Sequence, residues 1–246
     1  MTSEKNILGF HLFNGSAPEL IALLSDKVRA FPNRVSLFYG NSNLFNHCHR
    51  DVASFSRPEV VMANDGIALD VAARLLTGSP FAANLNGTDF TPRLMRESAL
   101  FRRAFLLGGQ PGVASRAAIT LMGQGIEVVG EANGFADMSD EAALIERINQ
   151  SQPDILLVAL GNPAQEYWIL RHREQLAVPL VVGVGALLDF LSGRVSRAPN
   201  WVQAVRCEWL YRLALEPRRL LRRYTLDMGR FFLLCLMSLR HAGGRV

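Results

Sequence analysis

The stretch PDILLVALGNPAQEYWILRHR, residues 153–173, indicates the fold most directly. Its apolar run at residues 154–160 predicts a buried strand. A Gly-Asn-Pro turn follows, and residues 164–176 predict a helix whose first turn holds Gln165 and Glu166. In a parallel α/β sheet, ligands bind in the crevice beyond the carboxyl ends of the strands. An amide and a carboxylate at this position therefore indicate a site for a polar, hydroxyl-rich ligand.

The same alternation of strand and helix extends through the middle of the chain. Further strands are predicted at residues 35–39, 59–62, 103–107, 126–129 and 180–184, and further helices at residues 67–76, 113–123 and 141–149. Apolar strands that alternate with helices are typical of a parallel sheet covered on both faces. The sequence therefore predicts an α/β fold with a mostly parallel sheet and helices on both faces.

Length and composition exclude several classes of protein. The chain has 246 residues, of which 49% are hydrophobic and 20% charged, which predicts a folded globular protein. The first residues lack a signal-peptide pattern, and the late apolar run at residues 231–239 is far shorter than the ~20 residues of a membrane-spanning helix. The scattered Cys48, Cys207 and Cys235 lack metal-ligand spacing, so we expect structural thiols in a reducing compartment.

Charge divides the chain unevenly. Residues 194–246 contain 11 arginines, no lysine and three acidic residues, a net charge of +8, whereas the whole chain carries +4. The pattern in this region is helical throughout. We therefore predict an α/β core at residues 1–195 and a helical, Arg-rich C-terminal appendage at residues 196–246. A basic end on an otherwise acidic body indicates an anionic partner, such as a phosphate-bearing lipid, a membrane surface or a nucleic acid.

The appendage is predicted to contain an amphipathic helix that begins at Pro217. At helical spacing its apolar face carries Leu220, Leu221, Tyr224, Met228, Phe231 and Phe232, and its opposite face carries Arg219, Arg222, Arg223 and Arg230. Two interpretations stay open at this point. The helix is docked with its arginines in solvent, or the appendage contacts anionic lipid or a lipid pyrophosphate.

Two glycine-containing turns follow predicted strands. In LLGGQPGVA, residues 106–114, backbone N–H groups could approach phosphate at a helix start, although a purely structural tight turn fits equally well. The segment is neither a dinucleotide fingerprint nor a P-loop. Gly134-Phe135 at the next strand end offers an aromatic contact to a base, with a core Phe as the alternative.

Polar residues follow strands and a helix in the first third of the chain. Asp65, in Asn64-Asp65-Gly66, is either a helix N-cap or a general base that activates a sugar hydroxyl. Asn41 is either a ligand-binding amide or a turn residue. Gly87-Thr88-Asp89 is again a turn or a polar site.

Missing motifs narrow the class of chemistry further. The sequence contains no Asp-x-Asp motif that would hold a divalent metal on a nucleotide diphosphate, no His/Cys cluster for zinc and no Gly-x-Ser-x-Gly nucleophile elbow. We therefore expect neither a bound metal nor a cofactor.

Taken in order, these motifs resemble the WecG/TagA/CpsF family of bacterial glycosyltransferases, glycosyltransferase family 26. The resemblance runs from about residue 36 to residue 224 and includes Asn64-Asp65-Gly66, Gly87-Thr88-Asp89, LLGGQPGVA and the stretch quoted first. It is completed by VGVGALLDFLSGRVSRAPNWVQAVRCEWLYRLALEPRRLLRRY, residues 182–224. The two longest motifs are the most specific.

The resemblance implies a Rossmann-like core and an inverting, metal-independent sugar transfer. The donor would be a nucleotide diphosphate sugar, usually a UDP-sugar of the N-acetylmannosamine, N-acetylmannosaminuronic acid or glucose type. The acceptor would be a saccharide linked to undecaprenyl pyrophosphate, in the biosynthesis of a cell-surface polysaccharide such as an exopolysaccharide. The protein would be cytoplasmic and peripheral on the inner face of the bacterial cell membrane, which it would contact through the appendage.

Residue roles carried over from the family motifs are expectations of the same kind. Asp65 would be the catalytic base. The substrate-binding residues would be Asn41, Thr88, Asp89, Gly108, Gly109, Gly134, Phe135, Gln165, Glu166, Arg212, Arg219 and Arg222.

Two departures from the family pattern leave alternatives open. Ala83-Asn84 stands where the family commonly has an Arg before Gly87-Thr88-Asp89, and Tyr39-Gly40 is atypical beside Asn41. A non-catalytic nucleotide-sugar-binding or scaffold protein of a polysaccharide locus is therefore the alternative function. Binding of nucleic acid is disfavoured because no recognised nucleic-acid module is present. The apolar face of the appendage leaves a homo-oligomer open.

Overall fold

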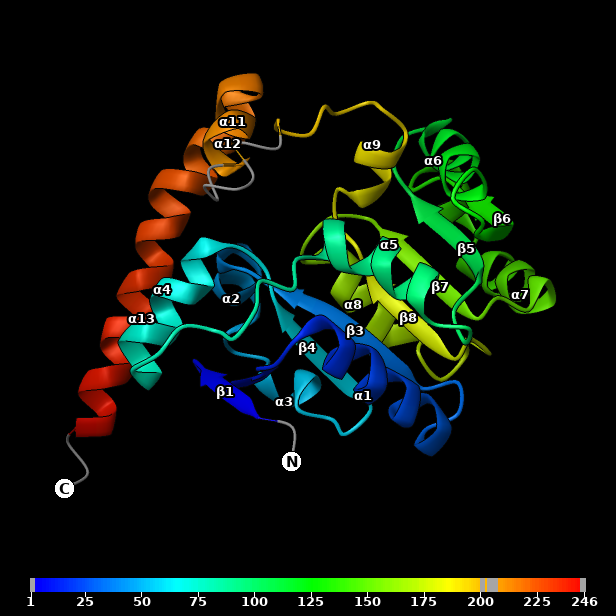
Figure 1. Cartoon of the computed structure of the whole chain (residues 1–246). Helices are drawn as coiled ribbons and strands as arrows, with labels where there is room; N and C mark the ends of the chain where they lie inside the picture. The colour runs from blue at the N-terminus through cyan, green and yellow to red at the C-terminus, as the bar shows by residue number, and fades with distance from the viewer. Residues whose placement is uncertain (1–2, 200–201, 203–207, 244–246) are drawn as a thin grey trace.

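The computed structural model describes residues 3–199, 202 and 208–243 (Figure 1). The strands are β1 (Glu4–Ile7), β2 (Phe10–Phe13), β3 (Val35–Gly40), β4 (Val60–Asn64), β5 (Arg103–Gly108), β6 (Glu127–Ala132), β7 (Ile155–Ala159) and β8 (Leu180–Gly183). The helices of the core are α1 (Ala17–Ala30), α2 (Ser42–Cys48), α3 (Val52–Phe55), α4 (Ile67–Thr77), α5 (Gly87–Glu97), α6 (Val113–Met122), η1 (Ala136–Ser139), α7 (Glu141–Ser151), α8 (Ala164–His172) and α9 (Leu187–Leu191). The C-terminal helices are α11 (Glu208–Leu215), α12 (Pro217–Arg222), η2 (Arg223–Asp227) and α13 (Met228–Gly243).

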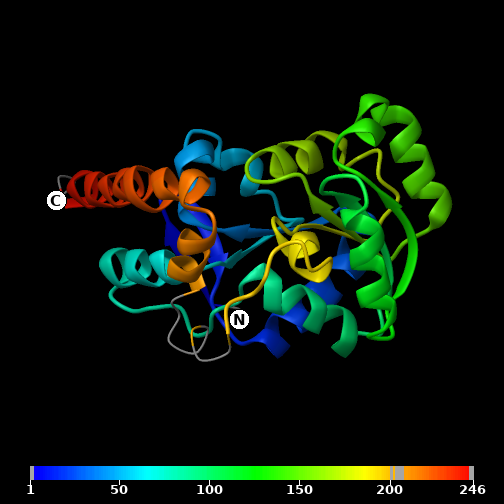
Figure 2. The same ribbon diagram turned by 90° about the horizontal axis from the view of Figure 1, so that it is seen from above.

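The core is built on a six-stranded sheet in the order β4-β3-β8-β7-β5-β6. Every pairing in this sheet is parallel, so all six carboxyl ends lie at the same edge. Helices cover both faces of the sheet, as the view from above shows (Figure 2). The predicted fold class is therefore confirmed. A small antiparallel hairpin, β1–β2, which the sequence did not predict, packs beside this sheet.

Alternation along the strands creates two hydrophobic cores. In β3, Phe38 belongs to one core and Leu37 to the other, because successive side chains in a strand point to opposite faces. The first core includes residues of α2, α4, α7 and α8, and the second includes residues of α1, α5 and α6. Apolar side chains covered on both faces explain why the strands read as continuous hydrophobic runs.

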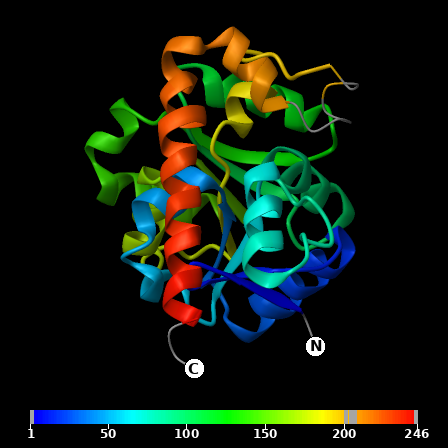
Figure 3. The same cartoon turned by 90° about the vertical axis from the view of Figure 1, so that its left-hand side faces the viewer.

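The C-terminal helices lie along one side of the core, where α13 runs beside α4 (Figures 1 and 3). The ring of Phe231 is completely buried, and its centroid lies 5.7 Å from that of Phe45 on α2. The interpretation of a docked helix is therefore confirmed for α13. The division of the chain at residue 195 stays a prediction.

The predicted apolar face of the appendage is wrong in one respect. Leu220 and Phe231 are completely buried or nearly so, but Leu221 is 55% exposed. Leu221 directly follows Leu220 on α12, and a helix turns about 100° per residue, so the side chain of Leu221 points away from the side on which Leu220 is buried.

Candidate functional site

A cleft of about 360 Å³ opens at the carboxyl edge of the sheet. Residues one or two positions beyond the end of each of the six strands line it. These residues are Asn41 after β3, Asp65 after β4, Gly109 after β5, Gly134 after β6, Gly161 after β7 and Gly185 after β8. Segments that are far apart in the sequence thus meet where a parallel α/β sheet binds ligands.

Asp65 is half-buried and lines the cleft. Its backbone N–H donates to the carbonyl oxygen of Gly40 at 2.8 Å, which ties the end of β4 to the end of β3. The N-cap position of α4 is Gly66, with a positive φ of 91°, so Asp65 precedes the cap. The N-cap interpretation of Asp65 is therefore wrong, and its carboxylate is placed on the cleft side of the turn.

The sequence left two roles open for Asn41, a turn residue or a ligand-binding amide. Its side-chain oxygen accepts hydrogen bonds from the backbone N–H groups of Asn43 and Leu44, each at 3.1 Å, and so caps α2. The residue also lines the cleft. Because the oxygen is used in the cap, the amide nitrogen is the group of this side chain that can serve a ligand.

The glycines after β5 and β6 meet in one compact structure. Gly134 donates its N–H to the carbonyl oxygen of Gly109 at 2.9 Å. Gly109 and Gly134 line the cleft, but Gly108 does not. A Cβ on Gly108 would lie 2.3 Å from the carbonyl oxygen of Ala159, and its φ is 128°. Gly108 therefore packs closely against β7, and its expected contact with a nucleotide stays a prediction.

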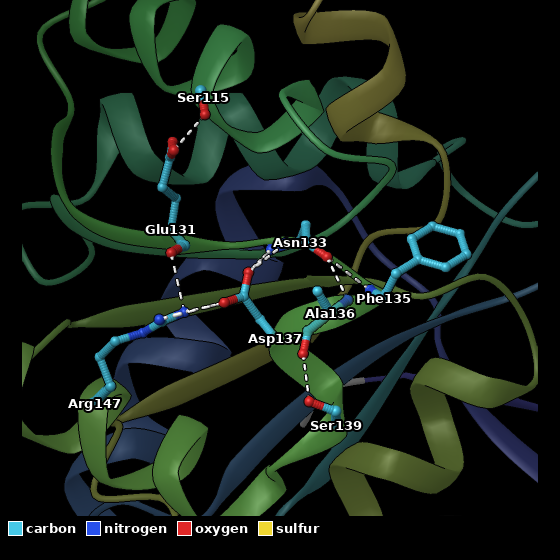
Figure 4. Close-up of polar contacts among 8 residues, drawn as sticks. All are labelled: Ser115, Glu131, Asn133, Phe135, Ala136, Asp137, Ser139 and Arg147. Carbon is cyan, nitrogen blue, oxygen red and sulfur yellow. Dashed lines mark hydrogen bonds and ion pairs between the residues drawn. The ribbon is translucent and has the colours of Figure 1, made fainter.

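Phe135 is 63% exposed and lines the cleft, so the core interpretation of this side chain is wrong. A network of polar groups holds the turn that carries it (Figure 4). The side-chain oxygen of Asn133 accepts from the N–H groups of Phe135 and Ala136, both at 2.9 Å. The Asp137 carboxylate accepts from the N–H of Asn133 at 2.7 Å and pairs with Arg147 at 3.4 Å. The aromatic ring points away from this network (Figure 4).

Gln165 and Glu166 differ in position although they are neighbours. Gln165 lines the cleft, and its side-chain oxygen accepts from the N–H of Gly185 at 3.0 Å. Glu166 is completely buried below the cleft. Burial raises the pKa of its carboxyl to about 7 against hydrogen bonds that act in the opposite direction. Glu166 has no exposed surface in this structure, and its expected role in binding the donor stays a prediction.

Thr88 and Asp89 are adjacent in the sequence, but they do not both line the cleft. Thr88 lines the cleft, whereas Asp89 lines a smaller neighbouring cavity of about 240 Å³. The Asp89 carboxylate pairs with Arg197 at 2.7 Å, and Arg197 also reaches Glu208 of α11 at 3.6 Å. Burial would raise the Asp89 pKa, but the hydrogen bonds from Arg197 and Asn86 outweigh it and lower the pKa. Asp89 thus forms an ion pair between the core and the appendage, and its expected contact with a substrate stays a prediction.

The arginines near the cleft are not those expected. Among the described residues, Arg194 and Arg223 line it, and Arg222 is exposed elsewhere. The π-helical turn begins at Arg223, which explains why simple helical spacing placed this residue on the far face. The side chains of Arg212 and Arg219 lie outside the described part of the structure.

Several cleft residues were missed by the sequence reasoning. Tyr39 donates to or accepts from Thr91 at 2.8 Å, and burial raises the pKa of its phenol. Asn162 belongs to the Gly-Asn-Pro turn, whose position after a strand could have identified it. Asp189 lies on α9 and pairs with Arg194 at 2.9 Å. No sequence signal distinguished this last pair from ordinary surface charges.

Within the part of the chain that the structure describes, no group of three or more His, Cys, Asp or Glu side chains lies where it could hold a metal ion. The expectation of a metal-independent reaction stays a prediction.

The fold and the cleft define a class: an α/β protein with a polar ligand site at the carboxyl edge of a parallel sheet, partly covered by basic helices. The comparison with known families specifies it further. The model of the glycosyl transferase WecG/TagA/CpsF family matches residues 5–244. The chain therefore belongs to this family, as the sequence motifs predicted.

One characterised relative is the N-acetylglucosaminyldiphosphoundecaprenol N-acetyl-beta-D-mannosaminyltransferase of Bacillus spizizenii. It is 32% identical to this chain over 158 residues, which are 63% of this chain and 60% of the relative. The matching region thus spans less than two thirds of that protein.

Proposed function

We propose that this protein transfers a sugar from a nucleotide diphosphate sugar to a saccharide carried on undecaprenyl pyrophosphate. The proposal is supported by membership of the family and by the name of the relative, which acts on an undecaprenyl-diphosphate-linked acceptor. The donor is a UDP-sugar, with N-acetylmannosamine favoured by the same relative. The pathway is the biosynthesis of a cell-surface polysaccharide.

One observation carries the proposal: Asp65 and the glycine turns after β5 and β6 line a single cleft. In a displacement reaction, a carboxylate on one wall of the cleft can accept the proton of the nucleophile, and backbone N–H groups on the other wall can bind the leaving group. Asp65 takes the proton of the acceptor hydroxyl, and groups across the cleft bind the departing diphosphate. Attack from the side opposite the leaving group inverts the anomeric carbon.

Asp65 is a better candidate for the base than the other carboxylate in the cleft. Among the described residues, Asp65 and Asp189 are the carboxylates that line it. Asp189 lies on α9 and forms an ion pair with Arg194 at 2.9 Å, whereas Asp65 directly follows β4 at the carboxyl edge of the sheet. Asp65 is also the residue that the family motif identifies.

Two positive groups and one aromatic ring suit the nucleotide diphosphate. Arg194 and Arg223 bring guanidinium groups to the cleft, where they can balance the negative charge of the leaving diphosphate without a metal. Phe135 offers an exposed ring on which a planar base can stack. Together they support a UDP-sugar donor.

The acceptor lipid implies contact with a membrane surface. Helices α13 and α4 lie side by side (Figure 3). Both carry exposed apolar side chains, which are Leu233, Leu236 and Met237 on α13 and Ile67, Val71 and Leu75 on α4. None of the described helices is both long and apolar enough to span a bilayer. We propose that this apolar surface and the arginines of the appendage bind the inner face of the cell membrane peripherally.

A transfer assay tests the function directly. Purified protein is incubated with UDP-N-acetylmannosamine, its uronic acid or UDP-glucose and with a short-chain analogue of N-acetylglucosaminyl diphosphoundecaprenol, with and without EDTA. The expected result is a lengthened lipid-linked product with one donor, undiminished by EDTA and inverted at the anomeric carbon. Donor binding without turnover with any acceptor would instead favour the non-catalytic alternative.

A further inference from the structure

Glu166 lies below the cleft at the centre of a polar cluster. Its Oε1 accepts a hydrogen bond from Gln165 Nε2 at 2.8 Å and another from Asn162 Nδ2 at 3.1 Å. Its Oε2 is buried and has no hydrogen-bond partner among the described residues. Both donors line the cleft, whereas Glu166 itself is completely buried. A carboxyl group held there without a counter-charge needs an explanation, because buried charge is unfavourable.

The amide orientations follow from the outer ends of the cluster. The backbone N–H of Gly185 can act only as a donor, so the atom of Gln165 that faces it at 3.0 Å is the oxygen. Gln165 Nε2 must then face Glu166. The backbone carbonyl oxygen of Asn162 can act only as an acceptor, so the atom of Asn43 that faces it at 3.2 Å is Nδ2. The same nitrogen donates to Asn162 Oδ1 at 2.9 Å, and Asn162 Nδ2 is then directed to Glu166.

The cluster joins three turns at the edge of the sheet. Asn43 follows β3, Asn162 follows β7 and Gly185 follows β8. Hydrogen bonds through Glu166 connect the last two directly and reach the first through Asn162. Any change in the acceptor at position 166 therefore reaches two cleft side chains at once.

We propose that Glu166 is a positioning residue: its carboxyl group orients the side-chain amides of Gln165 and Asn162 on the cleft floor and thereby sets the affinity for the nucleotide sugar. The identity of the ligand in this inference rests on the proposed function. The orientation of the two side-chain amides by Glu166 does not depend on that function. Without the acceptor, two buried N–H groups would lose their partner, and the side chains would turn to find others.

The surroundings of Glu166 contain no described cation that would hold it ionised. The titratable groups that interact electrostatically with it are Cys48 on α2 and Tyr167 on α8, and neither is a cation. Burial raises its pKa to about 7, from an ordinary value of 4.5. The native state therefore keeps the proton to a higher pH than the unfolded chain does. Stability contributed by the protonated carboxyl is present at low pH and is lost as the pH rises towards 7.

Nuclear magnetic resonance of the side-chain amides tests the orientation without any assay of activity. In the full-length protein labelled with ¹⁵N at Asn and Gln, the Asn162 and Gln165 amide signals are followed from pH 5 to pH 8. We expect both to shift together with a common midpoint near the pKa of Glu166. The shift should vanish in Glu166→Gln, which keeps an acceptor oxygen but cannot titrate. Glu174→Gln, at an exposed position just beyond α8, should titrate as the wild type does.

Binding of UDP supplies the second readout. Glu166→Gln should bind UDP within about threefold of the wild type, because the acceptor oxygen remains, whereas Glu166→Leu should bind it roughly tenfold more weakly. In the transfer assay the same loss should appear in KM for the donor more than in kcat. Rescue by Gln but not by Leu separates positioning from simple filling of space.

Different results would overturn the positioning role of Glu166 and the proposed enzymatic function. Amide signals that do not respond to pH in the wild type, or that still titrate in Glu166→Gln, would overturn the positioning role. Unchanged UDP affinity in a folded Glu166→Leu variant would overturn it as well. If the amides titrate as expected and UDP binds, but no sugar is transferred, the positioning role stands and the proposed enzymatic function is wrong.

Discussion

The α/β core and the C-terminal helices both bring residues to the cleft, but they do so in different ways. The core uses the ends of its strands, and each of the six contributes a residue one or two positions beyond its end. The C-terminal helices contribute Arg223, which reaches the cleft because α13 is docked and the chain passes through a π-helical turn.

This difference shows which parts of a site are set by the sheet and which by packing. Parallel strands place their following residues at one edge regardless of the details of the neighbouring helices. An arginine on a docked helix depends on the phase of that helix and on every contact that holds it. The predictions below test the two contributions separately, beginning with the largest effect.

Asp65→Asn tests the core contribution. It should keep the fold but reduce kcat by about 10²–10⁴-fold, the usual range for loss of a general base. Asp189→Asn, which removes the other carboxylate of the cleft, should cause a much smaller loss. Steady-state transfer assays measure both effects, with circular dichroism to check folding. Wild-type turnover in Asp65→Asn would remove the catalytic role from this residue.

Phe231→Ala tests whether the C-terminal helices are held by the core. The ring is completely buried against Phe45, so its loss should lower the free energy of unfolding by about 3–5 kcal/mol. Leu233→Ala, on the same helix but 57% exposed, should change it little. Urea denaturation followed by tryptophan fluorescence gives both values. Equal stabilities would mean that docking of α13 contributes little to the fold.

Arg223→Ala against Arg222→Ala tests the contribution of the C-terminal helices to the site. A hydrogen bond to a charged group is worth about 1.5–3 kcal/mol, so Arg223→Ala should weaken UDP binding by about 10–150-fold. Arg222 is exposed away from the cleft, and its loss should leave the affinity for UDP nearly unchanged. Calorimetric titration with UDP compares the two. The reverse order of effects would favour regular helical spacing over the observed π-helical turn.

Phe135→Ala tests a cleft residue that the core contributes, for comparison with Arg223 of the C-terminal helices. Stacking of a base on an aromatic ring is worth about 1–3 kcal/mol, and the exposure of this ring puts the effect at the lower end. UDP binding should weaken by about fivefold to tenfold, with kcat nearly unchanged, while Phe135→Tyr should keep the affinity. Inhibition constants for UDP and uridine against pyrophosphate identify the part of the ligand affected. An equal loss for pyrophosphate would place the base elsewhere.

Much of the fold could be predicted from local patterns because buried parallel strands are uniform apolar runs. Strands were expected at residues 35–39 and 154–160, and they are β3 and β7 with shifts of one residue at their ends. The β1–β2 hairpin was missed because each strand has four residues and its two-residue turn, Leu8-Gly9, has no distinctive pattern.

The site could be predicted less completely. Asp65, Gly109 and Gln165 follow strands or begin a helix, and each lines the cleft as position alone suggests. Glu166 follows Gln165 by one residue, but a helix turns about 100° per residue, so neighbouring side chains point in different directions. Its burial could not be read from the sequence because it depends on the elements that pack against α8.

The sequence by itself determined the parallel α/β core, the family and the set of turns from which the site is drawn. The alternation of side chains along a strand and the residue types within it are local properties of the sequence, and they do not depend on how the helices pack. Tertiary structure alone decided that Arg223 and not Arg222 meets the cleft, that Asp89 pairs with Arg197, and that Glu166 lies beneath the floor. These outcomes depend on distances between segments that are remote in the chain, and no local pattern records such distances.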